Sequence, residues 1–367
     1  MDTRLTVNYE NKPCYDIVFT SDFLGLTEEI LALGFEKRRI AIITDANVEK
    51  LYAEEVKKVL SKEFDTVVTY AIPAGEKNKN LDEIRKIYDF LMERHFDRHD
   101  LLIALGGGVV GDMCGFVAAT YLRGVSFVQI PTTLLAQTDS SVGGKTGVDL
   151  GGVKNMVGAF YMPRLVYMNV STLNSLSDRQ YASGFAEVMK YGLIKDESFY
   201  TWLIDNMYEI SDKDPEVVLE MVKHSCDIKR AVVEKDPTEK GDRMLLNFGH
   251  TLGHAIEKYK NFEMLHGECV ALGSIAAAFI SWKRGLLSME EYYEIRDMFV
   301  PFNLPISVED IEKEAVLDIT RSDKKADSDK IRFVLLKKIG KAFVDDSVTR
   351  QEMDKALDEI IYIENND

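Results

Sequence analysis

Three of the chain's six histidines lie between positions 250 and 266, at a spacing that suits a divalent-metal site. His250 and His254 are four residues apart, so on a helix their rings project from one face about one turn apart. His266 follows beyond a short loop. From spacing alone we expect His250 and His254 both to be metal ligands, with imidazoles buried in the core as the alternative. The metalloprotease motif H-E-x-x-H is absent because position 251 is Thr, so a zinc protease is disfavoured.

Three carboxylates could complete such a metal site: Glu187, Glu257 and Glu268. Glu187 lies in the largely apolar segment 184–191, where an ionised acid is costly to bury unless it is paired or bound to a cation. Lys190 would share its helix face, so an ion pair within the helix is the alternative to a ligand role. Glu257 is expected to be an ordinary surface carboxylate.

A strand, a glycine-rich turn and a helix are predicted across residues 101–112, which read L-L-I-A-L-G-G-G-V-V-G-D. The glycines would allow a tight turn and let a diphosphate approach the backbone N–H groups at the start of the helix. That geometry suits a dinucleotide. The pattern is not the usual G-x-G-x-x-G, so a strand–helix turn without a ligand is the alternative.

Polar residues come directly after two other predicted strands. Asp45 and Asn47 follow the strand 39–44, and the loop 75–79 follows the strand 66–72. Because the carboxyl ends of parallel strands meet along one edge of a sheet, these loops are expected to gather there. An Asp in this position could hold a ribose hydroxyl, and a helix N-cap is the alternative.

A basic and polar cluster follows the glycine turn. It includes Arg123, the segment 131–133, the segment 139–146 and Lys154 with its neighbour Asn155. The sequence G-G-K-T at 143–146 resembles the end of a P-loop, but the motif needs a Gly at position 139, where Asp stands. A nucleoside triphosphatase is therefore disfavoured. The glycine-flanked Lys145 still suits close approach to a phosphate, although any single Lys or Arg can simply be a solvated charge.

The elements that must position these residues divide the chain into two parts. Strands are predicted at 39–44, 66–72, 101–105 and 126–130, with helices at 48–60 and 81–93 between them. Such alternation predicts a parallel sheet covered by helices. Beyond residue 176 helical patterns dominate, at 178–193, 199–210, 215–234, 243–259, 268–284, 289–299 and 350–361, with short β-like runs at 331–337 and 341–344.

The predicted fold class is α/β, with a Rossmann-like β/α domain at residues 1–177 and a mainly α-helical domain at 178–367. The length of 367 residues agrees with two domains. The net charge of −16 disfavours nucleic-acid binding but permits a local basic pocket for an anionic substrate.

The four cysteines are widely spaced, so buried thiols are expected rather than disulfides. The apolar run 269–282 is too short to cross a bilayer and is expected to be a buried helix. The start of the chain lacks the apolar region of a signal peptide, so a cytoplasmic location is expected.

Ordered motifs run over about residues 45–341 of this chain. They are P-A-G-E-K-N-K at 73–79, G-G-G-V-V-G-D at 106–112, R-G at 123–124, P-T-T at 131–133, D-S-S-V-G-G-K-T at 139–146, K-N at 154–155, G-F-A-E-V-M-K-Y-G at 184–192, R-M-L-L-N-F-G-H at 243–250, H-A-I-E at 254–257 and H-G-E at 266–268. Together these motifs resemble those of the 3-dehydroquinate synthase family of sugar-phosphate cyclases.

The resemblance implies a metal, zinc or cobalt, held by Glu187, His250 and His266. It implies that His254 faces the substrate and is not a ligand, which differs from the expectation from spacing alone. It also implies that NAD is contacted by Asp45, Asn47, Glu76, Lys79, Gly107, Gly108, Val109, Asp112, Thr132, Thr133, Asp139, Lys145, Lys154, Thr172, Leu173, Asn174 and Ser175.

The resemblance further implies which residues meet the substrate. The implied substrate contacts are Arg123, Asn155, Lys229, Arg243, Asn247 and one of Lys324 and Lys325, and the implied catalytic residues are Lys190, His254, Lys145 and Asp139. Arg123 is similar to a family residue that reaches into the partner subunit's site, which implies a homodimer.

Three positions depart from the family pattern. Val153 stands where Gly is usual, Ser175 where Thr is usual, and Leu176 is not followed by the usual Pro. These departures concern the cofactor loops and leave the implied reaction unchanged.

The implied substrate is 3-deoxy-D-arabino-heptulosonate 7-phosphate, and the implied product is 3-dehydroquinate, made by transient oxidation with NAD, phosphate elimination, re-reduction and aldol closure. Arg243 and Lys229 suit the substrate carboxylate, and Lys145 suits the phosphate. The alternatives are another sugar-phosphate cyclase, whose substrate lacks the carboxylate, a metal-dependent polyol or glycerol-phosphate dehydrogenase, and a non-catalytic NAD-binding regulator.

Overall fold

The computed structural model describes residues 3–322 and 331–362. The chain forms two compact units. The first contains Met1–Ser175 with Lys229–Thr238, and the second contains Leu176–Ile228 with Glu239–Asp367. The division at 177 and 178 stays a prediction from sequence, and the grouping of Lys229–Thr238 with the first unit was not anticipated. Among the described residues, no helix combines the length and apolar character needed to cross a membrane.

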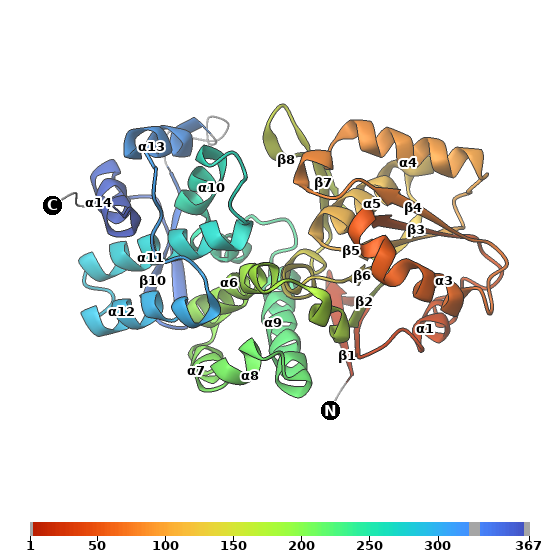
Figure 1. Cartoon of the computed structure of the whole chain (residues 1–367), viewed down its shortest axis with the longest axis horizontal. Helices are drawn as coiled ribbons and strands as arrows, with labels where there is room; N and C mark the ends of the chain where they lie inside the picture. Colours follow the sequence, from red (N-terminus) through yellow and green to blue (C-terminus); the bar gives the residue numbers. More distant parts are fainter. Residues whose placement is uncertain (1–2, 323–330, 363–367) are drawn as a thin grey trace. The chain divides into compact units, whose positions relative to one another are not determined.

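A seven-stranded sheet forms the centre of the first unit, in the order β1-β2-β9-β6-β5-β3-β4 (Figure 1). Only the β1–β2 pair is antiparallel, and all other neighbours are parallel. The predicted parallel sheet is therefore confirmed, although β1, β2 and β9 were not predicted. The strands are β1 Arg4–Tyr9, β2 Lys12–Thr20, β3 Ile40–Asp45, β4 Val67–Ile72, β5 Leu101–Gly106, β6 Ser126–Pro131 and β9 Leu165–Asn169.

Helices and one hairpin surround this sheet. The predicted helix at 48–60 begins earlier, and its first turns are α-helical and then π-helical. The elements are α1 Leu26–Ala32, α2 Ala46–Val48, η1 Glu49–Ala53, α3 Glu54–Leu60, η2 Glu76–Asn78, α4 Leu81–Glu93, α5 Gly108–Thr120, η3 Tyr121–Arg123, η4 Ala136–Ser140, η5 Val170–Ser175, and the antiparallel pair β7 Lys145–Leu150 and β8 Val153–Phe160.

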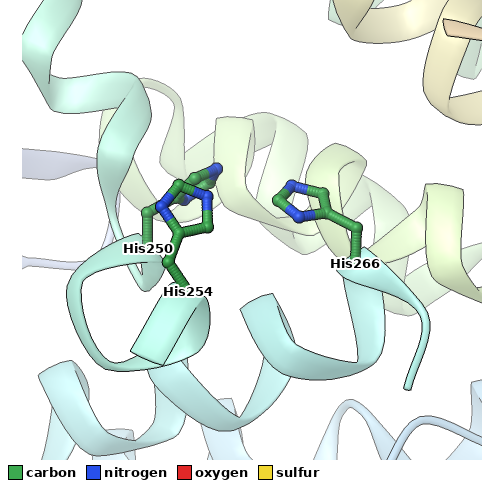
Figure 2. Close-up of side chains that lie close together, drawn as sticks. All are labelled: His250, His254 and His266. Carbon is green, nitrogen blue, oxygen red and sulfur yellow. The ribbon is translucent and has the colours of Figure 1, made fainter. Parts of the chain in front are cut away.

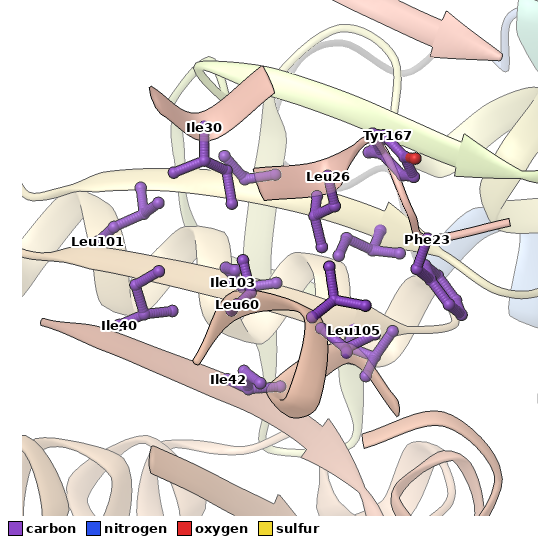
Figure 3. Close-up of a cluster of buried hydrophobic side chains, with 14 of the residues drawn as sticks. Phe23, Leu26, Ile30, Ile40, Ile42, Leu60, Leu101, Ile103, Leu105 and Tyr167 are labelled. Atoms are coloured by element: carbon purple, nitrogen blue, oxygen red, sulfur yellow. The ribbon is translucent and has the colours of Figure 1, made fainter. Parts of the chain in front are cut away.

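The buried strands supply a core on each face of the sheet, because successive side chains point to opposite faces. Ile40 and Ile42 of β3 belong to the core that includes Leu26 of α1 and Leu60 of α3 (Figure 3). The opposite face packs against α4 and α5, through residues that include Ala41, Ile43, Ile84, Ile87, Met113 and Val117. The two cores fix the positions of the strand ends and therefore of the loops that follow them.

The second unit is mainly helical, as predicted, with one two-stranded sheet. The predicted helix at 199–210 is two helices, and the predicted helix at 243–259 is interrupted. The elements are α6 Asp178–Lys195, α7 Glu197–Asp205, α8 Met207–Ser211, α9 Pro215–Lys235, η6 Asp242–Asn247, α10 His250–Tyr259, α11 His266–Lys283, α12 Met289–Asp297, η7 Val300–Phe302, α13 Lys313–Ser322, β10 Phe333–Lys338, β11 Lys341–Asp345 and α14 Arg350–Ile360. The last residues of α9 belong to the first unit.

The interruption before α10 has a steric cause at Gly249. This residue has φ +79°, a backbone conformation that residues other than glycine rarely adopt, and it is the N-cap that precedes His250. A Cβ at Gly249 would also lie 2.8 Å from the carbonyl oxygen of Val270. The backbone at Gly249 therefore packs directly on α11.

The cysteines remain thiols, as expected, and Cys114, Cys226 and Cys269 are buried. Burial raises the pKa of the Cys114 thiol far above its usual range. The apolar run 269–282 lies inside α11, and most of its residues are buried, so the expectation of a core helix is confirmed.

Candidate functional site

The histidine cluster lies where three helices of the second unit meet, and the close approach depends on glycine. Gly267, in the first turn of α11, has no room for a Cβ because it would collide with the carbonyl oxygen of Ser183 on α6. The N–H of Gly267 donates a hydrogen bond to Oγ of Ser183, at 3.0 Å. These contacts bring His266 on α11 beside Glu187 on α6.

Glu187 is fully buried and lies between the two histidines that the resemblance assigns to the metal. Its Oε1 atom is 3.3 Å from Nε2 of His250 and 3.2 Å from Nε2 of His266. Its Oε2 atom forms an ion pair with Nζ of Lys190. The structure therefore contains the ion pair foreseen as the alternative and also brings Glu187 to the histidines.

The other ring nitrogens of these two histidines face acceptors. Nδ1 of His250 lies 2.9 Å from the carbonyl oxygen of Phe248, and Nδ1 of His266 lies 3.4 Å from Oε2 of Glu257. Acceptors at Nδ1 favour the tautomer in which Nδ1 carries the proton and Nε2 presents a lone pair. Two nitrogen lone pairs and a carboxylate oxygen then face one another, an arrangement that fits a bound cation.

A further observation supports this fit. Neither carboxylate oxygen of Glu187 makes a hydrogen bond of acceptable geometry within the described part of the chain, although both are buried. The ammonium of Lys190 pairs with Oε2, and a metal ion would give Oε1 a cationic partner as well. The donor set of two imidazoles and one carboxylate is also one that zinc uses in catalytic sites.

The pKa shifts of Glu187 and His266 agree with a site that favours positive charge. Burial alone would raise the pKa of Glu187, but the Lys190 ammonium and His250 hold it well below its usual range. Burial opposes protonation of His266, yet the carboxylates of Glu187 and Glu257 raise its pKa to about 9. A cation would compete with that proton for the ring of His266.

His254 lies beside the other two histidines and is exposed (Figure 2). One ring nitrogen from each of His250, His254 and His266 lies within 4.8 Å of the others. The cluster therefore contains both the pair expected from spacing and the pair implied by the resemblance. Whether His254 binds the metal or the substrate stays a prediction.

The remaining carboxylate candidates have other environments. Glu257 is 3% exposed, so the expectation of an ordinary surface carboxylate is wrong. Its helix face is covered, and one of its oxygens faces His266. Glu268 binds Nε and Nη2 of Arg179 at 2.6 and 2.9 Å and also accepts from the backbone N–H of Leu265. Glu268 thus fastens the start of α11 to α6.

Two predicted substrate residues of the second unit lie in or beside η6. Arg243 is buried, and Asn247 Nδ2 donates to Oε1 of Glu239 at 2.9 Å. Sequence reasoning did not single out Glu239, which belongs to no motif and has φ +59° in the loop before η6. Lys324 and Lys325 lie outside the described residues.

Most predicted NAD contacts of the first unit lie in loops after the parallel strands. Asp45 ends β3, Gly107 and Gly108 follow β5, Thr132 follows β6, and Thr172 lies in η5 just after β9. The carboxyl ends of these strands share one edge of the sheet, where dinucleotides bind in folds of this class. The other predicted contacts here are Val109 and Thr133, with Leu173 buried and Asn174 and Ser175 exposed in η5.

Gln137 links several of these loops and was missed by sequence reasoning. Its side chain is fully buried, and Nε2 donates to the carbonyl oxygens of Pro131 and Asn169 and to Oγ1 of Thr172, at 3.1–3.2 Å. It therefore connects the ends of β6 and β9 to η5. A buried glutamine in η4 has no distinctive sequence pattern.

Asp45 is the N-cap of α2, which was the alternative to a contact with a ribose hydroxyl. Its Oδ1 accepts from the N–H groups of Asn47 and Val48, at 2.8 and 3.2 Å. One carboxylate oxygen is thereby committed to the cap, and the predicted contact to a ribose stays a prediction.

The predicted basic residues of the site differ in their environments. Nζ of Lys229 donates to the backbone oxygen of Asp139 and to its Oδ1, the latter at 2.8 Å. Nζ of Lys154 lies 3.7 Å from Glu76. Arg123 and Lys145 are exposed, in η3 and at the start of β7. Lys229 was placed in the second domain by sequence, but its contacts group it with the first unit.

Comparison with family models identifies both halves of the chain. Residues 69–183 match the model described as the 3-dehydroquinate synthase N-terminal domain, and residues 184–326 match the C-terminal domain.

Curated relatives extend the match over nearly the whole chain. A 3-dehydroquinate synthase of Acetivibrio thermocellus is 46% identical over 91% of this chain and 92% of its own length. The corresponding protein of Nitrosospira multiformis is 42% identical over 97% of this chain and 98% of its own length.

Solved structures share the fold. A 2-epi-5-epi-valiolone synthase from Streptomyces hygroscopicus subsp. jinggangensis, with NAD⁺ and Zn²⁺ bound, has a TM-score of 0.87 at 26% identity and covers 96% of this chain and 98% of its own. A 2-deoxy-scyllo-inosose synthase has a TM-score of 0.86 at 24% identity, over 97% of this chain and 99% of its own. On the family models and curated relatives, the chain belongs to the 3-dehydroquinate synthase family of enzymes.

Proposed function

We propose that the chain converts 3-deoxy-D-arabino-heptulosonate 7-phosphate into 3-dehydroquinate and phosphate, a step of the shikimate pathway toward aromatic amino acids. The observation that carries this proposal is the cluster of Glu187, His250 and His266 in a chain that belongs to this family. Such a cluster serves a reaction in which a hydroxyl is activated, and a pure NAD-binding regulator would not need it.

NAD and a divalent metal are the proposed cofactors. The 26%-identical valiolone synthase holds NAD⁺ and Zn²⁺, which supports both. The glycine loop and its neighbours would hold NAD, and Glu187, His250 and His266 would hold the metal. NAD would supply the reversible hydride acceptor that a transient oxidation needs, and the metal would supply a Lewis acid for the hydroxyl that is oxidised.

The reaction is redox-neutral overall. The hydride removed from C5 returns to the same carbon, and between these steps a proton leaves C6 and phosphate leaves C7. The temporary ketone at C5 is what acidifies the proton at C6. Ring opening and an intramolecular aldol closure then give the carbocycle without an external oxidant.

The basic residues have separate proposed tasks. Arg243 and Lys229 bind the substrate carboxylate, while Lys145 and Asn155, with Arg123 of a second copy, bind the phosphate. A guanidinium or ammonium fits these anions because it offers only donors. The burial of Arg243 makes its charge more effective, because water screens it less.

Proton transfer is assigned to the substrate's own phosphate, assisted by two residues. The phosphate can accept the C6 proton as it leaves. The exposed imidazole of His254 and the ammonium of Lys190 would move protons to and from the oxygens of the substrate. Asp139, hydrogen-bonded to Lys229, would orient that lysine.

We also propose zinc as the metal, with cobalt able to replace it, a homodimer, and a cytoplasmic location. The His₂Glu donor set suits zinc and also cobalt. Metal analysis of the purified protein, light scattering after size-exclusion chromatography, and cell fractionation test these three points.

The decisive experiment incubates the purified protein with the heptulosonate phosphate, catalytic NAD⁺ and Zn²⁺. We expect stoichiometric phosphate and 3-dehydroquinate, with no accumulation of NADH at 340 nm. Glucose 6-phosphate and sedoheptulose 7-phosphate serve as substrates that lack the carboxylate. Turnover of one of these in place of the heptulosonate phosphate would identify another cyclase, and stoichiometric NADH formed from a polyol would identify a dehydrogenase.

A further inference from the structure

Lys79, at the end of η2, joins a residue of the glycine loop helix to a residue of the β7–β8 hairpin. Its Nζ atom lies 2.6 Å from Oδ2 of Asp112 on α5 and 2.6 Å from Oδ1 of Asn155 on β8. Its side chain is 4% exposed, whereas Asn155 is an exposed residue. All three residues belong to the first unit.

The bond from Lys79 decides which end of the Asn155 amide is presented. An ammonium group has donors and no acceptor, so the amide oxygen must face Lys79. The NH₂ group of Asn155, with its two donors, is then turned away from Lys79. A pair of amide donors at an exposed position suits an anionic oxygen such as that of a phosphate.

The backbone of Asn155 is held by the same loop. Its N–H donates to Oδ1 of Asp149 at 2.8 Å, and the N–H of Asp149 donates to the carbonyl oxygen of Lys79 at 2.9 Å. Asn155 has φ +53°, a left-handed conformation that is uncommon outside glycine and needs surrounding contacts to persist. The side chain of Lys79 therefore holds the amide of Asn155, while Asp149 holds its backbone and is itself bonded to the carbonyl oxygen of Lys79.

The charge of Lys79 is balanced within the protein. Asp112 lies at 2.6 Å and Glu76 at 3.9 Å from its Nζ atom. An ammonium that is buried and paired in this way has little attraction left for a ligand anion. Its hydrogen bond to Asn155 is consequently the contact through which it can affect a bound phosphate.

We propose that Lys79 is a positioning residue, which orients the Asn155 amide so that its NH₂ group binds the substrate phosphate. The proposal rests on the proposed function, because it takes Asn155 as a phosphate contact. It also links the glycine loop to the hairpin, since Asp112 lies in the first half of α5, after Gly107 and Gly108.

The test is a double-mutant cycle with Lys79→Met and Asn155→Ala. Each single substitution is expected to raise the KM for the heptulosonate phosphate about 10-fold, a usual cost for one hydrogen bond to a charged group. The kcat should change less than about 3-fold on the same reasoning. The double variant should match Asn155→Ala alone, because Lys79 acts through Asn155.

The matched control is Lys77→Met, an exposed lysine of the same loop, which should leave the KM unchanged. If the KM increases of the two single variants multiplied in the double variant, the proposal would be overturned. A Lys79→Met variant that changes only the affinity for NAD⁺, or one that behaves as Lys77→Met does, would overturn it as well. If Lys79→Met fails to fold, the double variant Lys79→Met/Asp112→Asn removes the charge of Lys79 together with that of its partner Asp112. The variant Lys79→Arg keeps a donor for the Asn155 oxygen and tests whether the KM is restored.

Calorimetry with inorganic phosphate separates this proposal from the proposed function. If the wild-type protein released no phosphate from the heptulosonate phosphate, the proposed function would fail. Weaker binding of inorganic phosphate by both single variants would still support the role of Lys79. Equal binding by wild type and Lys79→Met, or no binding by either, would overturn it.

Discussion

Oε2 of Glu257 lies 3.4 Å from Nδ1 of His266, and the Glu257 side chain is almost completely buried. The other nitrogen of this ring faces Glu187 at 3.2 Å. Glu257 and His266 thus have the geometry of a carboxylate–histidine pair, in which the outer carboxylate would fix the tautomer and ring orientation of a histidine that binds a metal through Nε2.

The first prediction concerns Glu257→Gln. The glutamine keeps the size of the side chain but removes the negative charge behind His266, so zinc affinity should fall about 10-fold or more. Competition with a chromophoric chelator measures the dissociation constant without reference to turnover. Glu290→Gln, at an exposed position of α12, is the matched control. Equal zinc affinity in both variants would contradict the assigned role.

The second prediction separates the two hypotheses for His254. If His254 serves the substrate, His254→Asn should retain zinc and lose about 100-fold in kcat, the usual worth of an acid–base group. His250→Asn should instead lose the metal. Metal analysis of both purified variants gives the answer. Loss of zinc from His254→Asn to the same degree would support the assignment from helical spacing.

The third prediction concerns the contact between α6 and α11. Gly267→Ala adds a Cβ that collides with the carbonyl oxygen of Ser183, so the helices must separate. The free energy of unfolding should fall by about 2–3 kcal/mol, and zinc binding should weaken because Glu187 and His266 move apart. Gly25→Ala is the control, since its Cβ would lie an ordinary 3.6 Å from the Tyr167 hydroxyl. Urea denaturation compares the two variants.

The fourth prediction concerns acid stability. Hydrogen bonds from Arg284, at 2.6 and 2.9 Å, lower the pKa of Glu352 from 4.5 to about 2. A lowered carboxyl pKa stabilises the fold above pH 4.5, and this contribution is lost as the pH falls toward 2. Because both side chains are partly exposed, Glu352→Gln should cost only about 1 kcal/mol at pH 7.

That difference from wild type should shrink steadily below pH 4.5, because the carboxyl of the unfolded chain, with its usual pKa of 4.5, is then progressively protonated while that of the folded chain stays ionised. Denaturation at several pH values between 7 and 3 measures it. A difference that stays constant over this range would show that charge pairing with Arg284 is not its cause.

Much of this protein can be read from local sequence. Apolar runs predicted β3, β4, β5 and β6 to within about a residue, because a buried strand must be apolar along its length. The glycine turn predicted the start of α5, where an added Cβ would lie 2.7 Å from Val110 at Gly106 and 3.0 Å from Ser140 at Gly108. The residue motifs were specific enough to identify the family, which the comparisons confirm.

Local patterns missed β1, β2, β9 and the break at Gly249. The break depends on contacts with α11, because a Cβ at Gly249 meets Val270. Helical periodicity continued through this position, so the pattern suggested one helix where the structure has η6 and α10. Periodicity describes single elements and carries no information on what packs against them.

The sequence by itself determined which residue types are present and how they are spaced on each element. Only the tertiary structure decided which of them meet. Glu187 lies far from His250 and His266 along the chain, yet it faces both, and Glu257 is buried because its helix is covered. Lys79, at the end of η2, likewise meets Asn155 of β8. The reason is physical: spacing along a helix or strand sets the direction of a side chain, whereas its partner is set by how separate elements pack.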